Sequence, residues 1–313
     1  MKKVLIIGSG SIAKKHQTIL NELAFETYLY SDKSRYNTLK NKKLCKFLKN
    51  KNELINILKN NHFSFAVIAN ETFKHFNAIN FCIKNNLNIF CEKPIGSYIF
   101  DYKKIRQKLI KKKLFFMCNY QLQNLDCIIK IKEILKNEKI ISFNMSVGHD
   151  LLNWRKDKIR RESYYINKKK GGGVIFELIH EINLINFIFG DFSKLKTFKK
   201  NIRQNFNCED VAISIIKMKK NILGSLYQDM ISPTLFRKLD IICKNNYYEI
   251  DLIKNTIILN KSKKVRFKKI DQSNLIKKNI IYYTKFIKKK LSLKFYDEAI
   301  NDLKIVMKMH DEI

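Results

Sequence analysis

The chain has 313 residues, 45% hydrophobic and 29% charged, so it can bury a sizeable core, and its length is typical of two domains. The formal net charge of +34 comes mainly from lysines spread along the chain, which favours a lysine-coated surface over a dedicated nucleic-acid site. Seven cysteines without a C-x-x-C pair, and apolar stretches all shorter than the ~18 residues of a membrane span, argue against a disulfide framework, a zinc site and a membrane protein. We therefore expect a cytoplasmic protein that binds no metal, no membrane and no specific nucleic acid.

The first 120 residues alternate between short apolar runs and segments with helical spacing. The runs KVLIIG, ETYLYS, FSFAVIAN, LNIFCE and LFFMCNY have the composition of buried strands. Between them, segments such as TFKHFNAINFCIKNN place apolar residues on one helical stripe. This alternation predicts right-handed β–α–β crossovers, and hence an α/β domain with a parallel, doubly wound sheet over residues 1–120.

The remainder of the chain has a different texture and predicts a second domain over residues 121–313. A helix, LDCIIKIKEILKN, precedes a strand, KIISFNMSVGHD. A basic aromatic loop over residues 151–173, LLNWRKDKIRRESYYINKKKGGG, then leads into one helix, VIFELIHEINLINFIFG. Several β-rich runs separated by turn-like pairs predict an antiparallel meander. An amphipathic helix over about residues 296–313 closes the chain, and we expect it to pack back on the first domain.

A glycine-rich turn, GSGSIA, lies between the first expected strand and the first expected helix. It matches the G-x-G-x-x-G/A fingerprint of dinucleotide binding, in which the first glycine permits a tight turn and the second admits a pyrophosphate. The amides at the start of the following helix would then bind the phosphates. The predicted coenzyme contacts in this turn are Gly8, Ser9, Gly10, Ser11 and Ile12.

The end of the second expected strand, YSDKSR, should contact the adenosine ribose of such a coenzyme. If Asp32 holds that position, its carboxylate accepts a hydrogen bond from the 2′-hydroxyl and selects NAD. If Ser31 holds it, with Lys33 and Arg35 nearby, a 2′-phosphate fits and NADP is favoured. The sequence leaves both alternatives open.

The tripeptide Glu92-Lys93-Pro94 ends an apolar run, and it contains one of only two prolines in the chain. Ligands of open parallel sheets sit outside the carboxyl ends of the strands, so a lysine there can point its ammonium at a substrate hydroxyl or carbonyl. Proline can fix the turn through a cis bond, which sets the direction of the lysine by the backbone.

Taken together, these motifs resemble the glucose–fructose oxidoreductase/inositol dehydrogenase (Gfo/Idh/MocA) family. The resemblance rests on GSGSIA, NETFKH, CEKPIG and GGGVIFELIHEINLINFIFG in this order, and it covers nearly the whole chain. It implies a Rossmann domain followed by an α+β domain with a large open, mostly antiparallel sheet. It also implies hydride transfer between NAD or NADP and a carbinol carbon of a sugar or cyclitol. The family's sheet commonly packs against another subunit, which implies a homodimer or homotetramer.

The resemblance also implies roles for individual residues. Lys93 would bind and polarise the reacting oxygen, and His180 would be the acid/base, with Glu177 three residues earlier on the same helical face to orient it. An imidazole suits this proton transfer because its unperturbed pKa is ~6.5, and an ammonium stabilises a developing alkoxide. Lys93 would also contact the coenzyme, and three further residues would line its cleft, namely Asn70, His75 and Glu92.

The chain departs from the family pattern near the expected acid/base. Phe176 stands where members often carry an aspartate, Asn183 replaces the usual aspartate three residues after the histidine, and Gln123 stands where an arginine is common. These departures leave two other readings open. One is reduction of a different C=O or C=N centre, and the other is a nucleotide-binding regulatory or scaffolding protein without turnover.

The basic aromatic loop resembles a branch of the family that is associated with surface-polysaccharide and nonulosonic-acid pathways. Arginine forks suit carboxylates and phosphates, so the loop favours an anionic sugar or a sugar nucleotide as substrate. The expected substrate-binding residues of this loop are Arg155, Arg160, Arg161 and Tyr164.

Overall fold

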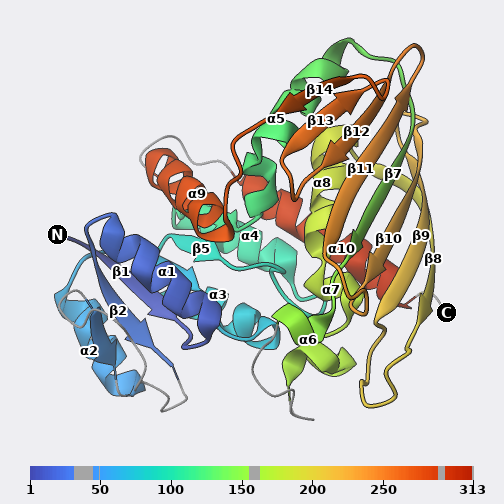
Figure 1. Cartoon of the computed structure of the whole chain (residues 1–313). Coiled ribbons are helices and arrows are strands. Elements are labelled where there is room, and N and C mark those ends of the chain that lie inside the picture. The colour runs from blue at the N-terminus through green and yellow to red at the C-terminus, as the bar shows by residue number, and fades with distance from the viewer. Residues whose placement is uncertain (32–44, 49, 155–162, 288–292, 312–313) are drawn as a thin grey trace. The chain divides into compact units, whose positions relative to one another are not determined.

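The computed structural model describes residues 1–31, 45–48, 50–154, 163–287 and 293–311 (Figure 1). The chain divides into two compact units. The first unit comprises residues 1–119 with 272–303, and the second comprises residues 120–271 with 304–313. The expected residues Asp32, Lys33, Arg35, Arg155, Arg160 and Arg161 lie outside the described residues.

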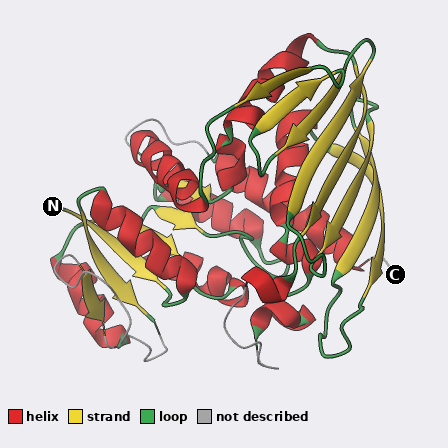
Figure 2. Ribbon diagram, viewed as in Figure 1, coloured by secondary structure: helices red, strands yellow, loops and turns green. Residues whose placement is uncertain are grey.

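The first unit contains a six-stranded sheet with the order β3-β2-β1-β4-β5-β6, and its strand pairs are parallel. The order reverses between β1 and β4, which is the topological switch point where doubly wound folds bind ligands. The predicted Rossmann-type sheet is therefore confirmed (Figure 2). The strands are β1 (Lys2–Ile7), β2 (Phe25–Tyr30), β3 (Cys45–Leu48), β4 (Phe63–Ile68), β5 (Ile89–Cys91) and β6 (Phe116–Cys118).

Two helices of the first unit begin at a side-chain cap. Asn50 caps α2 by accepting from the Glu53 amide, and Asp101 caps α4 by accepting from the Lys104 amide. The helix α9 supplies Tyr283, which is fully buried against Phe65 and Phe90 of the sheet. The helices are α1 (Ser11–Glu22), α2 (Lys51–Asn60), α3 (His75–Lys84), α4 (Tyr102–Lys111), α9 (Gln272–Phe286) and most of α10 (Lys294–Asp311).

The second unit contains an eight-stranded sheet with the order β14-β13-β12-β11-β7-β10-β9-β8. All its pairs are antiparallel except β7 with β10, which run parallel. The expected antiparallel meander is therefore interrupted, because β7 lies between β10 and β11. The predicted large, mostly antiparallel sheet is confirmed. The strands are β7 (Ile140–Gly148), β8 (Phe192–Lys200), β9 (Val211–Met218), β10 (Leu223–Asp229), β11 (Phe236–Cys243), β12 (Tyr247–Asp251), β13 (Thr256–Leu259) and β14 (Lys263–Arg266).

The glycine-led helix of the second unit is broken. It consists of α7 (Val174–Glu177) and α8 (Ile179–Phe189), with Leu178 between them outside the helical range at φ −104° and ψ 36°. The segments Lys168–Glu177 and Ile179–Phe189 are bent by 53°, so the expectation of one continuous helix is wrong. The other helices are α5 (Asp126–Ile134) and α6 (Leu151–Trp154), and short 3₁₀ turns lie at Thr72–Lys74, Gln121–Asn124, Leu135–Asn137, Tyr164–Ile166 and Lys168–Lys170.

Within the described ranges, no single helix is both long enough and apolar enough to cross a membrane. The bent pair Lys168–Glu177 with Ile179–Phe189 meets both requirements only when its two parts are taken together.

Candidate active site

The glycine turn after β1 has the geometry that a dinucleotide fingerprint requires. Gly8 has φ +132°, and a Cβ on it would lie 2.4 Å from the carbonyl oxygen of Ala69 at the end of β4. A Cβ on Gly10, by contrast, would meet nothing within 4 Å. Gly8 is therefore needed for the close approach of two strand ends, whereas Gly10 leaves its backbone open to a ligand.

The N-terminus of α1 is available to an anion. Gly10 is the N-cap residue, no side chain caps the helix, and no acidic residue lies in its first turn. The first amides of a helix lack intrahelical acceptors and carry the positive end of the helix dipole. Ala13 is fully buried, as close packing of the helix on the sheet requires. The turn and the helix start thus fit a pyrophosphate group.

The end of β2 is joined to this turn at two points. The Gly8 amide donates to the carbonyl of Tyr30 at 2.8 Å, and the Ser9 and Ser31 hydroxyls are 2.9 Å apart. Ser31, the first residue after β2, therefore lies beside the glycine turn.

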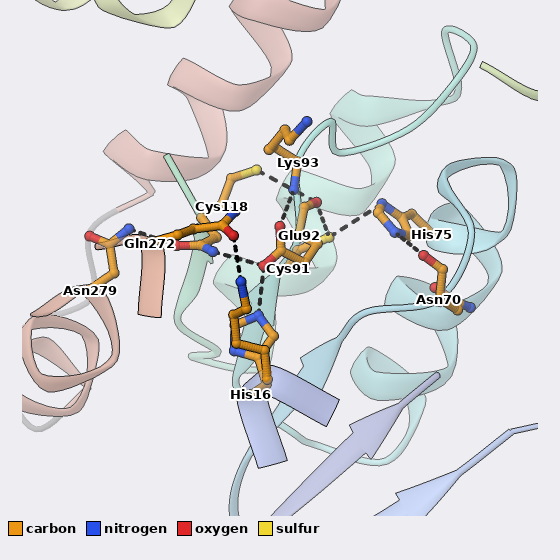
Figure 3. A network of polar contacts seen from close by, with 11 residues as sticks. His16, Asn70, His75, Cys91, Glu92, Lys93, Cys118, Gln272 and Asn279 are labelled. Atoms are coloured by element: carbon orange, nitrogen blue, oxygen red, sulfur yellow. Dashed lines mark hydrogen bonds and ion pairs between the residues drawn. The ribbon is translucent and has the colours of Figure 1, made fainter. Parts of the chain in front are cut away.

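Glu92 directly follows β5, and its side chain is held in a buried polar network (Figure 3). Its Oε1 is 2.6 Å from Nε2 of His16 and accepts from Nδ2 of Asn119 at 2.7 Å. Burial alone would raise the pKa of Glu92, but His16, the Asn119 amide and the charge of Lys93 together hold it below its usual value. The carboxylate is therefore the charged form at neutral pH.

The network extends to α9 and to the Lys93 backbone. Asn279 of α9 donates from Nδ2 to Oδ1 of Asn119 at 2.7 Å, and the Lys93 amide donates to Oε2 of Glu92 at 3.3 Å. His16 is fully buried on α1 and is not among the site residues expected from the sequence. The sequence feature that points to His16 is its position inside the apolar stripe of the helix that follows the glycine turn.

The other side of Lys93 is held by His75. The Lys93–Pro94 peptide bond is cis, as the sequence allowed. Nδ1 of His75 is 2.8 Å from the carbonyl oxygen of Pro94, and Nε2 is 3.1 Å from that of Asn70 after β4. Burial lowers the pKa of His75, so the imidazole is neutral and has one N–H to donate. A single N–H can serve only one of the two carbonyls, and the shorter contact, to the Pro94 carbonyl, is the better suited to hold the turn. The Lys93 side chain itself is half-buried.

His180 belongs to the second unit, near the start of α8. It is 7% exposed, and its ring packs edge-on against Tyr120 with centroids 6.2 Å apart. Gln228 of β10 donates from Nε2 to the Leu178 carbonyl at 2.8 Å, within the helix break. One residue after His180, the fully buried Glu181 pairs with Arg237 of β11 at 2.7 Å. The turn that carries His180 is thus held to two strands.

Glu177 is the last residue of α7 and is 9% exposed. The break at Leu178 separates it from His180, so the expectation that both residues share one face of one helix is wrong. Regular helical spacing therefore does not determine how the side chains of Glu177 and His180 are oriented.

Two of the sequence departures contact each other. Nε2 of Gln123 donates to Oδ1 of Asn183 at 2.8 Å, and Asn183 is 3% exposed. A neutral amide pair therefore stands where family members commonly carry an arginine and an aspartate. The third departure, Phe176, is buried, and its ring packs edge-on against His310 at a centroid distance of 5.2 Å.

Tyr164 is the one expected substrate-binding residue that lies within the described residues. Tyr164 lies in a 3₁₀ turn, half-buried, with its ring against Tyr165 at 5.5 Å. All seven cysteines are free and buried. Among the residues that the structure describes, no group of three or more His, Cys, Asp or Glu side chains could hold a metal ion.

Comparison with known families gives two matches along the chain. The model described as "Oxidoreductase family, NAD-binding Rossmann fold" (GFO_IDH_MocA) matches residues 2–120, and the GFO/IDH/MocA C-terminal domain matches residues 128–249. The chain belongs to the GFO/IDH/MocA oxidoreductase family. The resemblance read from the motifs is thereby confirmed, and so are the expectations of an NAD(P)-dependent oxidoreductase and of NAD or NADP as its coenzyme.

Solved structures share this fold at low sequence identity. UDP-N-acetylglucosamine 3-dehydrogenase GnnA from Acidithiobacillus ferrooxidans superposes with a TM-score of 0.82 at 12% identity, covering 99% of this chain and 97% of that one. Myo-inositol 2-dehydrogenase from Lactobacillus plantarum gives 0.80 at 17% identity, covering 99% and 96%. GenD2 from gentamicin A biosynthesis, in complex with NAD, gives 0.79 at 12% identity, covering 98% and 92%. In a comparison with curated proteins, no sequence matches the chain.

Proposed function

We propose that the protein transfers a hydride between NAD or NADP and the carbinol or carbonyl carbon of a sugar, a sugar nucleotide or a related polyol. The observation that carries the proposal is the Glu92-Lys93-Pro94 turn. This turn lies at the carboxyl end of β5 in a GFO/IDH/MocA chain, and buried contacts on both sides fix its backbone. A lysine on a fixed turn can present its ammonium in one direction to a bound substrate.

In this proposal the residues of the chain bind the oxygen and move the proton. The nicotinamide, when bound, accepts or donates the hydride. Lys93 binds the reacting oxygen and stabilises the negative charge that forms on it. His180 takes the hydroxyl proton during oxidation and returns it during reduction. Glu177 supports His180 electrostatically, and Asn70, His75 and Glu92 shape the coenzyme side of the site.

The substrate class is supported by charge and by the structural neighbours. Arg155, Arg160, Arg161 and Tyr164 precede the helices that carry His180, and arginine forks bind carboxylates and phosphates. The neighbours named above include dehydrogenases of a UDP-sugar and of inositol. We therefore propose an anionic sugar or a sugar nucleotide, within the branch of the family associated with surface polysaccharides.

We further propose that residues 1–120 form the coenzyme domain, to whose compact unit residues 272–303 also belong, and that the rest of residues 121–313 binds substrate and assembles subunits. A homodimer or homotetramer would form through the eight-stranded sheet. Its support is a group of exposed apolar side chains that the strand register places on one face, namely Phe198, Ile213, Ile215, Leu223 and Ile242.

We also propose a cytoplasmic location for the protein. Its seven cysteines are free thiols, which fits the reducing cytoplasm.

The test measures turnover and coenzyme binding separately in Lys93→Ala and His180→Ala. With a panel of sugars, sugar acids and nucleotide sugars, each variant should lose at least about a hundredfold in kcat while its Kd for coenzyme stays within about threefold. Lys111→Ala and His62→Ala, at exposed positions, are the matched controls and should keep full activity.

The second candidate is a nucleotide-binding protein without turnover. The Gln123–Asn183 amide pair and the buried Phe176 favour it, because each replaces a charged residue that is usual near the acid/base. Tight coenzyme binding by the wild type, with no turnover of any compound in the panel, would establish this candidate. Retention of full activity in both alanine variants would instead refute the assignment of Lys93 and His180.

A further inference from the structure

Gly8 and Ser9 follow β1, and Ser31 follows β2. These strands are parallel neighbours, with Ile7 opposite Tyr30. Beyond that pair, the Gly8 amide donates to the Tyr30 carbonyl, and the Ser9 and Ser31 hydroxyls are 2.9 Å apart. The side chain of Ser31 is therefore directed to the turn whose open backbone fits the pyrophosphate.

In doubly wound folds the residue at this place meets the adenosine ribose. A carboxylate there accepts from the 2′-hydroxyl of NAD and repels the 2′-phosphate of NADP. A serine hydroxyl carries no charge, and it can either donate or accept a hydrogen bond. It can therefore bind either a 2′-hydroxyl or a 2′-phosphate.

We propose that Ser31 is the residue that faces the ribose 2′ position, and that the protein accepts NADP(H) at least as well as NAD(H). The sequence of the following residues agrees with this assignment, because positions 32–35 (DKSR) contribute two basic side chains against one acidic one. The inference rests on the coenzyme binding that the proposed function includes, and it does not depend on the roles of Lys93 or His180.

The experiment measures Kd for NADH and NADPH without any substrate, by protein fluorescence or titration calorimetry. For the wild type, Kd for NADPH should equal or fall below that for NADH. Ser31→Asp should weaken NADPH binding at least about tenfold, because a carboxylate would then face the 2′-phosphate. Its Kd for NADH should stay within about threefold or improve. Ser31→Glu provides a second acidic variant should the aspartate variant fold poorly.

Two controls separate position from charge. Ser193→Asp adds the same charge at an exposed site in the second unit and should change neither Kd. Asp32→Asn tests the alternative assignment and should leave the NADH to NADPH ratio within about threefold of the wild type.

The opposite results would overturn the inference. One is a wild type that binds NADH more than about tenfold more tightly than NADPH and loses that preference in Asp32→Asn, which would assign the position to Asp32. Another is an unchanged ratio in both acidic variants of Ser31. A wild type that binds neither coenzyme would refute coenzyme binding itself, and with it the proposed function. A wild type that binds coenzyme and lacks turnover leaves this inference standing.

Discussion

The buried contacts of Glu92 hold the turn that carries Lys93 in the proposed site. It follows β5, is 7% exposed, and has His16 and Asn119 on one oxygen and the Lys93 amide on the other. A buried carboxylate remains charged only where such partners replace water. The orientation of Lys93 therefore depends on a residue of α1 and, through Asn119, on Asn279 of α9.

Glu92→Gln should destabilise the protein by about 2–4 kcal/mol at pH 7, because the amide leaves His16 without its charged partner in a buried site. The folded-state pKa of Glu92 lies below the unfolded value near 4.5, so its contribution is present above that value and is lost as the pH falls through the folded pKa. Urea unfolding at pH 7 and at pH 4 and below checks this. The difference between wild type and variant should shrink as the pH falls.

The control for this measurement is Glu133→Gln on α5, whose side chain is 63% exposed. It should change the free energy of unfolding by less than about 0.5 kcal/mol. An equally small effect of Glu92→Gln, or one that does not vary with pH, would show that the buried carboxylate contributes little to the fold.

Gln123 and Asn183 form a second contact that the sequence alone does not predict. Each is by itself a departure from the family pattern, and the 2.8 Å contact between them makes the two changes one substitution of a neutral pair for a charged pair. Gln123→Arg and Asn183→Asp should each destabilise, because each places a charge beside an amide, and Asn183 is almost fully buried. The double variant should recover at least about 1.5 kcal/mol of the summed cost.

A double-mutant cycle in urea checks this coupling. Additivity within about 0.5 kcal/mol would show that the two positions are independent and that the charged pair cannot be restored here. Recovery would explain how the two departures can occur together without loss of the fold around His180.

At the scale of elements, the break between α7 and α8 is the feature that most affects the candidate site. At the break, the Leu178 carbonyl accepts from the Gln228 side chain of β10 at 2.8 Å and, at 3.4 Å, from the Glu181 amide. Gln228 is fully buried, so its amide reaches this carbonyl inside the unit and not through solvent.

Gln228→Met keeps the length of the side chain but removes the donor to Leu178. It should cost about 0.5–1.5 kcal/mol of stability, because the buried Leu178 carbonyl loses its shorter hydrogen bond and keeps only the 3.4 Å contact with the Glu181 amide. It should also shift the imidazole NMR resonances of His180, two residues after Leu178. The exposed His62 is the internal control, and its resonances should not move. Unchanged His180 resonances in a folded variant would show that the break does not depend on Gln228.

Sequence periodicity predicted most elements of both sheets, but it missed those that gain their stability from tertiary contacts. The helix α9 was not predicted, although it places Tyr283 against Phe65 and Phe90 in the core of the first unit. The edge strand β3 has four residues and was overlooked, because such a short run gives little periodic signal. The break at Leu178 was missed because the apolar pattern continues through it.

At the scale of the whole molecule, the sequence predicted the architecture better than the site. The order of the glycine turn, the Glu-Lys-Pro turn and the glycine-led helix was sufficient to identify the family and both sheets. The contacts around Glu92 could not be predicted, because His16, Asn119 and Asn279 are far apart in the chain. The roles of Lys93 and His180 remain predictions.

The seven cysteines permit a prediction that spans both units. All are buried free thiols, and burial raises the pKa of Cys127 and of Cys208 to about 12 and that of Cys243 to about 11. A thiol reacts as its thiolate, so native protein should react very slowly with a thiol reagent at pH 8. In denaturant all seven should react at once. Titration with DTNB, with and without guanidinium, measures how many thiols react, and how fast, in the native and in the unfolded protein.

The outcome distinguishes a uniformly packed molecule from one with a loosely packed unit. If all seven thiols are labelled slowly, each becomes reactive only when its unit opens, so the labelling rate reports the free energy of that opening. Fast labelling of Cys45, Cys82, Cys91 and Cys118 alone would assign low stability to the first unit, and addition of coenzyme should then slow it. Fast labelling of any cysteine that coenzyme leaves unchanged would contradict the packing described for its unit.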